Sequence, residues 1–221
     1  LHMAFPQTCS ACENHEVHSQ QPICLSCLSE LPYTGFENHR NNKVEKLFWG
    51  RVPLNFATST FHFTEDSRMQ HILHQMKYKD ALGLGIYMGR LMGYSLSKLI
   101  QDHQIDLCIP MPLHRKKQFS RGYNQATLLC KGIRETTQLE YDEKALIRIH
   151  HTETQTNKSR VERWENVTGI FKAANPNAIQ GKNILIIDDV ITTGASTESC
   201  AHALYNTGAR SISIASLAYT N

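Results

Sequence analysis

The sequence has no long hydrophobic run and almost no excess of charge of either sign. No apolar stretch approaches the roughly 18–20 residues that a helix needs to cross a bilayer. The first residues also lack the charged and then apolar layout of a secretory signal peptide. We therefore expect a cytoplasmic protein without membrane insertion. Its 23 lysines and arginines stand against 20 acids, and the resulting formal net charge of +3 does not by itself indicate a nucleic-acid partner.

Internal repeats, low-complexity tracts and a helix-turn-helix pattern are also missing. A chain of 221 residues can hold one sizeable α/β domain and a small appendage. We interpret Leu1 and His2 as a cloning remnant ahead of Met3 and expect no functional role for them.

Basic residues gather in two stretches. The first contains Arg115, Lys116, Lys117, Arg121, Lys131 and Arg134, and the second contains Lys158, Arg160 and Arg163. Both stretches could contact phosphates, but blocks of lysine and arginine more often form a solvated surface.

Four of the seven cysteines form two closely spaced pairs near the N-terminus, Cys9 with Cys12 and Cys24 with Cys27. Four thiolates suit a tetrahedral zinc ion, which would stabilise a segment too short to bury a core of its own. We therefore predict a structural zinc knuckle. Two disulfides are the alternative, and His15 or His18 could replace one thiol. Cys108, Cys130 and Cys200 lie in apolar patterns and are predicted to be core residues.

The rest of the chain alternates between strand and helix patterns. We expect strands at 56–63, 105–110, 146–149, 169–173, 184–187 and 211–217, and helices at 67–79, 82–102, 124–136 and 196–206. This alternation predicts an α/β fold with a mainly parallel sheet and flanking helices. We place the knuckle at residues 1–37, a polar linker at 38–50 and the main domain at 51–221.

The most informative segment runs from residue 184 to 197. Four apolar residues typical of a strand covered on both faces are followed by Asp188 and Asp189, and then by a turn rich in hydroxyl groups, Thr192 to Thr197, at the start of a helix. The turn contains Gly194, which lets backbone N–H groups close around an anion. A generic strand followed by a capped helix, as in receiver domains and ATPases, is the alternative.

This segment resembles the phosphoribosyl pyrophosphate (PRPP) signature of type I phosphoribosyltransferases at every position. The resemblance implies that Asp188 and Asp189 hold the ribose hydroxyls. It also implies that a 5′-phosphate binds to the turn formed by Thr192, Thr193, Gly194, Ala195, Ser196 and Thr197.

Loops at the carboxyl ends of parallel strands meet in one crevice, so the loops after residues 109, 149 and 187 should complete this site. Arg121 and Asn124 follow the first of these strands and offer donors for pyrophosphate or DNA, although Asn124 could simply cap a helix. Lys158, Arg160 and Arg163 lie in a long polar loop that has the length of a binding segment or lid.

The two cysteine pairs, the Pro-Met-Pro-Leu-His segment at 110–114, the Arg-Gly-Tyr-Asn-Gln segment at 121–125, the polar loop and the PRPP signature together resemble the competence protein F (ComF) family. The resemblance covers nearly the whole chain. It implies an amidophosphoribosyltransferase-like fold and a role in natural transformation, with single-stranded DNA and DNA-uptake proteins as possible partners. No glutaminase domain accompanies these motifs.

Three functions follow from these residues. The first is binding of PRPP, a 5′-phosphorylated nucleotide or single-stranded DNA in support of DNA uptake. The second is an active phosphoribosyltransferase that uses PRPP with Mg²⁺ and transfers phosphoribose to an unknown nitrogen acceptor. The third is a regulator that senses PRPP and contacts a partner through the knuckle.

Overall fold

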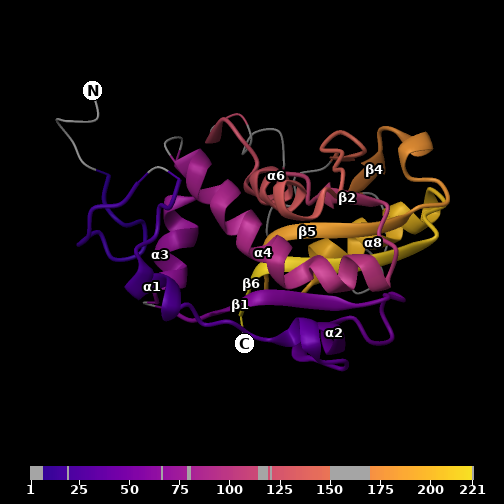
Figure 1. Cartoon of the computed structure of the whole chain (residues 1–221). Coiled ribbons are helices and arrows are strands. Elements are labelled where there is room, and N and C mark those ends of the chain that lie inside the picture. Colours follow the sequence, from indigo (N-terminus) through magenta and orange to yellow (C-terminus); the bar gives the residue numbers. More distant parts are fainter. Residues whose placement is uncertain are drawn as a thin grey trace, which may run out of the picture.

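A computed structural model of the chain describes residues 7–18, 20–65, 67–78, 81–113, 119, 121–149 and 170–220. Its centre is a four-stranded sheet with the order β1-β6-β5-β2, in which every neighbouring pair is parallel (Figure 1). The strands are β1 (Ala57–Phe63), β2 (Leu107–Pro110), β5 (Asn183–Ile191) and β6 (Ser211–Thr220). Ile184 to Ile187 of β5 are fully buried, as expected for a parallel strand covered on both faces. The predicted α/β class with a parallel sheet is confirmed.

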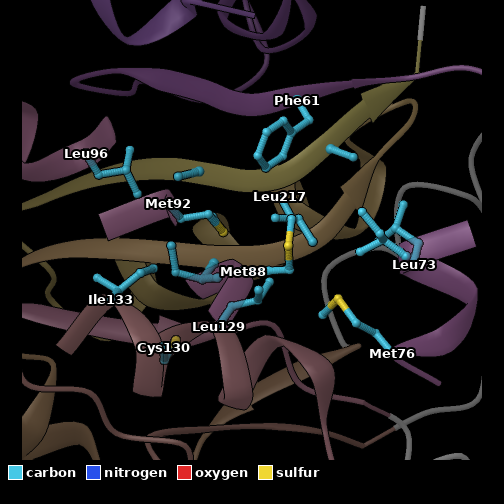
Figure 2. Close-up of a cluster of buried hydrophobic side chains, with 14 of the residues drawn as sticks. Phe61, Leu73, Met76, Met88, Met92, Leu96, Leu129, Cys130, Ile133 and Leu217 are labelled. Carbon is cyan, nitrogen blue, oxygen red and sulfur yellow. The ribbon is translucent and has the colours of Figure 1, made fainter. Parts of the chain in front are cut away.

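Three helices cover one face of the sheet. They are α3 (Arg68–Gln75), α4 (Leu82–Asp102) and α6 (Gln125–Thr137). Their apolar residues recur at helical spacing and join Leu185 and Ile187 of β5 in one buried cluster. Figure 2 shows side chains from α4, α6, β1 and β6 meeting in this cluster.

The opposite face is covered by α2 (Lys43–Leu47) and α8 (Ala195–Asn206), which form a second buried cluster with Ile184 and Ile186. Within the described residues there are also three short helical elements, α1 (Leu25–Ser29), η1 (Phe36–Asn38) and η3 (Pro176–Ala178). None of the helices in the described ranges combines the length and the apolar content needed to cross a membrane.

Helices α4 and α6 approach each other unusually closely because glycines line their contact. A Cβ atom placed on Gly89 would lie 2.3 Å from the carbonyl oxygen of Leu129, and one placed on Gly132 would lie 2.1 Å from the carbonyl oxygen of Ile86. Gly85 and Gly93 face α6 in the same way. The two backbones therefore pack directly against each other and fix α6 relative to the sheet.

Residues 7–18 and 20–37 pack against the main body of the molecule. Ile23 and Leu31 belong to the same buried cluster as Met76 and Met88, and Tyr33 forms an isolated bridge with Phe61 of β1. This segment therefore shares its core with the α/β fold.

The segment expected to be a linker, 38–50, contains helix α2 and packs on the sheet. The side chain of Asn42 caps this helix by accepting hydrogen bonds from the N–H groups of Val44 and Glu45. Val44 and Phe48 are almost completely buried in the cluster that contains Ile184. Figure 1 shows α2 beside β1.

Two predicted strands do not belong to the parallel sheet, so this part of the prediction was wrong. β3 (Leu146–Arg148) and β4 (Phe171–Ala173) pair with each other in an antiparallel two-stranded sheet. Each has only three residues, and Lys172 at the centre of β4 is exposed. A strand with an exposed central lysine does not suit a parallel sheet that is buried on both faces.

Candidate functional site

The two acids of the signature lie near the carboxyl end of β5. Asp188 and Asp189 are both partly exposed, and each carboxylate accepts a hydrogen bond from the next backbone N–H, at 2.9 Å from Asp189 N and 2.8 Å from Val190 N. Asp188 is paired in register with Ser216 of β6, the neighbouring strand. The sheet thus presents two carboxylates side by side at one edge.

Asp188 is held in surroundings that disfavour its charge. Burial of the carboxyl group raises the pKa of Asp188 well above its ordinary value, and the adjacent Asp189 raises it further. The N–H of Asp189 and the guanidinium of Arg148 on β3 act in the opposite direction. The ionised form of Asp188 would therefore gain from a ligand that donates hydrogen bonds.

The turn between β5 and α8 has the geometry of an anion-binding loop. Gly194 adopts a left-handed conformation with φ +72°, and α8 begins directly after it. The N-cap residue, Gly194, has no side chain to cap this helix, and the Thr193 hydroxyl accepts from Ala195 N at 3.5 Å. Thr192, Thr193 and Ser196 are exposed, and Thr197 is buried. A helix N-terminus that follows a glycine and has hydroxyls nearby is suited to a phosphate.

The loop after β2 lies beside this edge, because Met111 N donates to the carbonyl oxygen of Ile187 at 2.7 Å. Asn124 caps α6: its side chain accepts from Ala126 N at 3.0 Å and donates to the carbonyl oxygen of Met111 at 3.0 Å. This is the role that the sequence left open as an alternative, and it fixes the loop. Arg121 is partly exposed, and its guanidinium donates to Gln125 Oε1 at 3.1 Å.

A cavity separates this loop from the β3–β4 hairpin. Its lining includes Pro112, Asn124, Lys144 and Arg148. The predicted pyrophosphate or DNA residues Lys158, Arg160 and Arg163 lie outside the described residues, as do Lys116 and Lys117.

Two arginines near the site were not identified from the sequence. Arg148 influences Asp188 from β3, and Arg51 donates to the carbonyl oxygen of Thr193 at 3.0 Å. Arg51 is 142 residues away from Thr193 along the chain. No local pattern could have indicated such contacts, since both depend on the tertiary fold.

The four N-terminal cysteines come together in one cluster. The Sγ atoms of Cys9, Cys12, Cys24 and Cys27 all lie within 4.8 Å of one another, and none of the seven cysteines, all of which are in described ranges, forms a disulfide. Four sulfurs at about 2.3 Å from a tetrahedral zinc ion would have a comparable mutual spacing. The cluster could therefore hold a metal ion, in an arrangement consistent with structural zinc.

Backbone N–H groups further suit the cluster to thiolates. Cys9 Sγ accepts from Ala11 N at 3.4 Å and from Cys24 N at 3.3 Å, and a hydrogen bond from the backbone of Asn14 lowers the pKa of Cys12 to about 7. His15 is exposed, with its Nδ1 3.5 Å from Cys12 Sγ and 3.9 Å from Cys24 Sγ. It lies beside the four sulfurs, which already supply a complete tetrahedral set.

Comparison with known proteins is consistent with this geometry. Residues 139–221 match the model of the phosphoribosyl transferase domain family. The chain is 27% identical over 223 residues to competence protein F of Haemophilus influenzae, covering 99% of this chain and 93% of that protein.

Two further relatives match a shorter region. DNA utilization protein YhgH of Escherichia coli O157:H7 is 28% identical over 146 residues, which cover 65% of this chain and 63% of that protein. Competence protein ComFC of Bacillus subtilis is 31% identical over 147 residues, which cover 66% of this chain and 57% of that protein. Both matches span less than two thirds of the relative's length.

Proposed function

Because this chain is homologous to competence protein F, ComFC and YhgH and carries a match to the phosphoribosyl transferase domain, we propose that its crevice binds a 5′-phosphorylated pentose in support of DNA uptake. PRPP, a nucleotide and the 5′ end of single-stranded DNA all contain this group. The proposal thus names the chemistry that these ligands share.

The observation that carries the proposal is the junction of β5 and α8. Two adjacent carboxylates precede, by only a few residues, a helix N-terminus whose N-cap residue is a glycine, and exposed hydroxyls line the intervening turn. Carboxylates accept hydrogen bonds from sugar hydroxyls, whereas backbone N–H groups donate to phosphate. One short segment therefore offers complementary groups for both parts of a sugar phosphate.

The residues divide by chemistry. Asp188 and Asp189 accept the ribose hydroxyls, and the turn from Thr192 to Thr197 holds the 5′-phosphate. Arg121 contacts a pyrophosphate or the next phosphates of a strand, together with Lys158, Arg160 and Arg163. The carboxylate oxygens are also ligands of the kind that Mg²⁺ prefers, so they suit the ion that accompanies PRPP. Cys9, Cys12, Cys24 and Cys27 hold a structural zinc.

Catalysis is the second candidate, and the domain match over residues 139–221 favours it. In a phosphoribosyl transfer, the bond from the anomeric carbon to pyrophosphate breaks and an acceptor nitrogen forms the new bond to that carbon. The donors around the crevice would stabilise the charge that develops on the departing pyrophosphate.

Calorimetric titration of the zinc-loaded protein tests the proposal. The ligands are ribose 5-phosphate, PRPP with Mg²⁺, and one short oligonucleotide with either a 5′-phosphate or a 5′-hydroxyl. We expect saturable binding of the phosphorylated ligands, and the binding of ribose 5-phosphate and PRPP, which present free sugar hydroxyls, should be lost in Asp188→Ala/Asp189→Ala. The matched control is Glu135→Ala/Glu140→Ala. It removes two exposed acids, one in the last turn of α6 and one just after this helix, and should bind as wild type does.

The outcomes separate the candidates. Equal binding of the two oligonucleotides, or wild-type affinity in the double aspartate variant, would contradict the proposal. Release of pyrophosphate from PRPP in the presence of a nitrogen acceptor would establish catalysis in addition to binding.

A further inference from the structure

Arg51 connects the turn after α2 to the phosphate loop. Gly50 adopts φ +70° and lets the chain turn back, so that Arg51 N donates to the carbonyl oxygen of Phe48 at 3.0 Å. The guanidinium then donates through Nη1 to two carbonyl oxygens, that of Leu47 at 2.8 Å and that of Thr193 at 3.0 Å. One side chain thus joins the end of α2 to the residue before Gly194.

Phe48 packs against the same loop. A Cβ atom on Gly194 would lie 2.9 Å from the Phe48 ring, so the ring packs directly against the backbone of this glycine. Phe48 is 2% exposed and belongs to the buried cluster under α8. The loop therefore packs on a buried side chain, and Arg51 forms a hydrogen bond to the residue next to this contact.

Arg51 also forms an ion pair with Glu198. Its Nε donates to Glu198 Oε2 at 3.0 Å, and its Nη2 donates to the same oxygen. Glu198 lies in the first turn of α8, where an acid is favoured by the helix dipole. An unpaired carboxylate at this position would repel a phosphate bound at the same helix N-terminus. Pairing with Arg51 removes this competition.

We propose that Arg51 is a positioning residue, which fixes the phosphate loop through Thr193 and neutralises Glu198 so that α8 can accept a phosphate. The inference rests on the proposed sugar-phosphate function of this loop. It assigns Arg51 no contact with the ligand itself. Residues 43–51 thereby become a structural part of the site, although they precede the phosphate loop by more than 140 residues.

The first test needs no ligand. Arg51→Gln removes the guanidinium that contacts both Thr193 and Glu198. Arg90→Gln is the matched control, since Arg90 is exposed to a similar degree and pairs with Glu135 away from the loop. We expect the backbone order parameters of Thr193 and Gly194, measured by ¹⁵N relaxation, to fall from about 0.85 toward 0.6 in Arg51→Gln. The amides of β5 and β6 should keep their values, and Arg90→Gln should change neither set. Unchanged order at Thr193 would overturn the inference.

The second test uses ribose 5-phosphate in calorimetry. Arg51→Gln should bind ribose 5-phosphate about tenfold more weakly than wild type. The affinity of Arg51→Lys should lie between these two, because lysine restores the charge but cannot form all the hydrogen bonds of the guanidinium group. Adding Glu198→Gln to Arg51→Gln should recover part of the affinity without restoring the order of the loop. Equal affinity in wild type and Arg51→Gln would overturn the positioning role.

The two proposals fail in different ways. If wild type does not bind ribose 5-phosphate while Arg51→Gln still loosens Thr193 and Gly194, the proposed function is wrong and the bracing of the loop by Arg51 stands. If wild type binds and neither the order nor the affinity changes in Arg51→Gln, the function stands and the role of Arg51 is wrong.

Discussion

The surroundings of Asp188 disfavour its ionised form, and this lowers the stability of the folded protein. Its pKa in the folded protein is raised well above the ordinary value of 3.8, first by burial and then by Asp189. The folded state therefore binds more protons than the unfolded state between these two pKa values. As a result, stability falls as the pH rises through this interval. At neutral pH the surroundings of this carboxyl group therefore oppose folding.

We predict that Asp188→Asn raises the free energy of unfolding at pH 7, because the amide has no charge that burial and Asp189 would disfavour. The difference from wild type should disappear below about pH 3, where the carboxyl group is protonated in both states. Urea unfolding at a series of pH values measures this. Glu65→Gln, at an exposed position after β1, should show no such effect. A lowered stability of Asp188→Asn at pH 7 would show that the fold needs the charge.

At the scale of residues, the sequence was informative where a site is local. Asp188, Asp189 and the turn that follows are adjacent in the chain, so their chemistry could be read from one segment. Arg51 and Arg148 reach this segment only through tertiary packing. Sequence analysis could not place them because lysine and arginine are usually surface residues.

Among the elements, the contact between α4 and α6 is the most sensitive to added volume. We predict that Gly89→Ala lowers the free energy of unfolding by about 1–3 kcal/mol, because the new methyl group would overlap the backbone of Leu129. Gly83→Ala is the matched control: it is the same change in the same helix at an exposed position, where replacing glycine stabilises a helix by about 0.5–1 kcal/mol. Thermal unfolding of both variants measures the contrast. Equal effects would show that the two helices separate at little cost.

Loss of the cysteine cluster should also destabilise the buried core of the protein. We predict about one zinc per chain in metal analysis, and loss of this zinc together with a lowered unfolding midpoint in Cys27→Ala. The physical reason is that Ile23 and Leu31 share a buried cluster with α3 and α4, so an unfolded knuckle would expose that core.

The control for this prediction is Cys130→Ala. Cys130 is a fully buried cysteine outside the cluster, so the change should reduce stability while leaving the zinc content unchanged. A folded wild-type protein without metal, or Cys27→Ala with a full complement of zinc, would contradict the assignment.

The predicted bounds of an element were accurate where the periodic hydrophobic pattern extends over many residues. Helix α4 begins at Leu82 and ends at Asp102, the bounds expected from its periodicity. The error concerned β3 and β4, which have three residues each. Three residues show that a segment is extended but do not determine its partner, and in this case the two segments pair with each other across the intervening loop.

At the scale of the whole molecule, the N-terminal quarter is built into both faces of the α/β fold. The knuckle completes the cluster that contains α3 and α4, while α2 and Phe48 complete the cluster under α8. Polar composition suggested a linker at 38–50, but composition cannot show that two or three apolar residues in such a segment are buried. The phosphate loop consequently depends on residues from both ends of the chain.

The net charge of only +3 bears on how the affinity for single-stranded DNA should depend on salt. A uniformly basic groove would hold many phosphates, and its affinity would fall steeply with salt, by roughly 0.7 units of log K per unit of log salt for each phosphate contacted. The proposed site holds one terminal phosphate firmly and only a few others. We therefore predict a shallow salt dependence, with a slope of about −1 to −3 for a 5′-phosphorylated oligonucleotide.

The length of the oligonucleotide distinguishes binding of its 5′ end by the phosphate loop from binding along a basic surface. If the loop reads the 5′ end, oligonucleotides of 6, 12 and 24 nucleotides should bind with nearly the same affinity and slope, and removal of the 5′-phosphate should weaken all three equally. Fluorescence anisotropy at several salt concentrations measures both quantities. A slope that steepens with length and ignores the 5′-phosphate would instead assign DNA binding to the basic stretches of the surface. In that case the phosphate loop would be reserved for a free sugar phosphate.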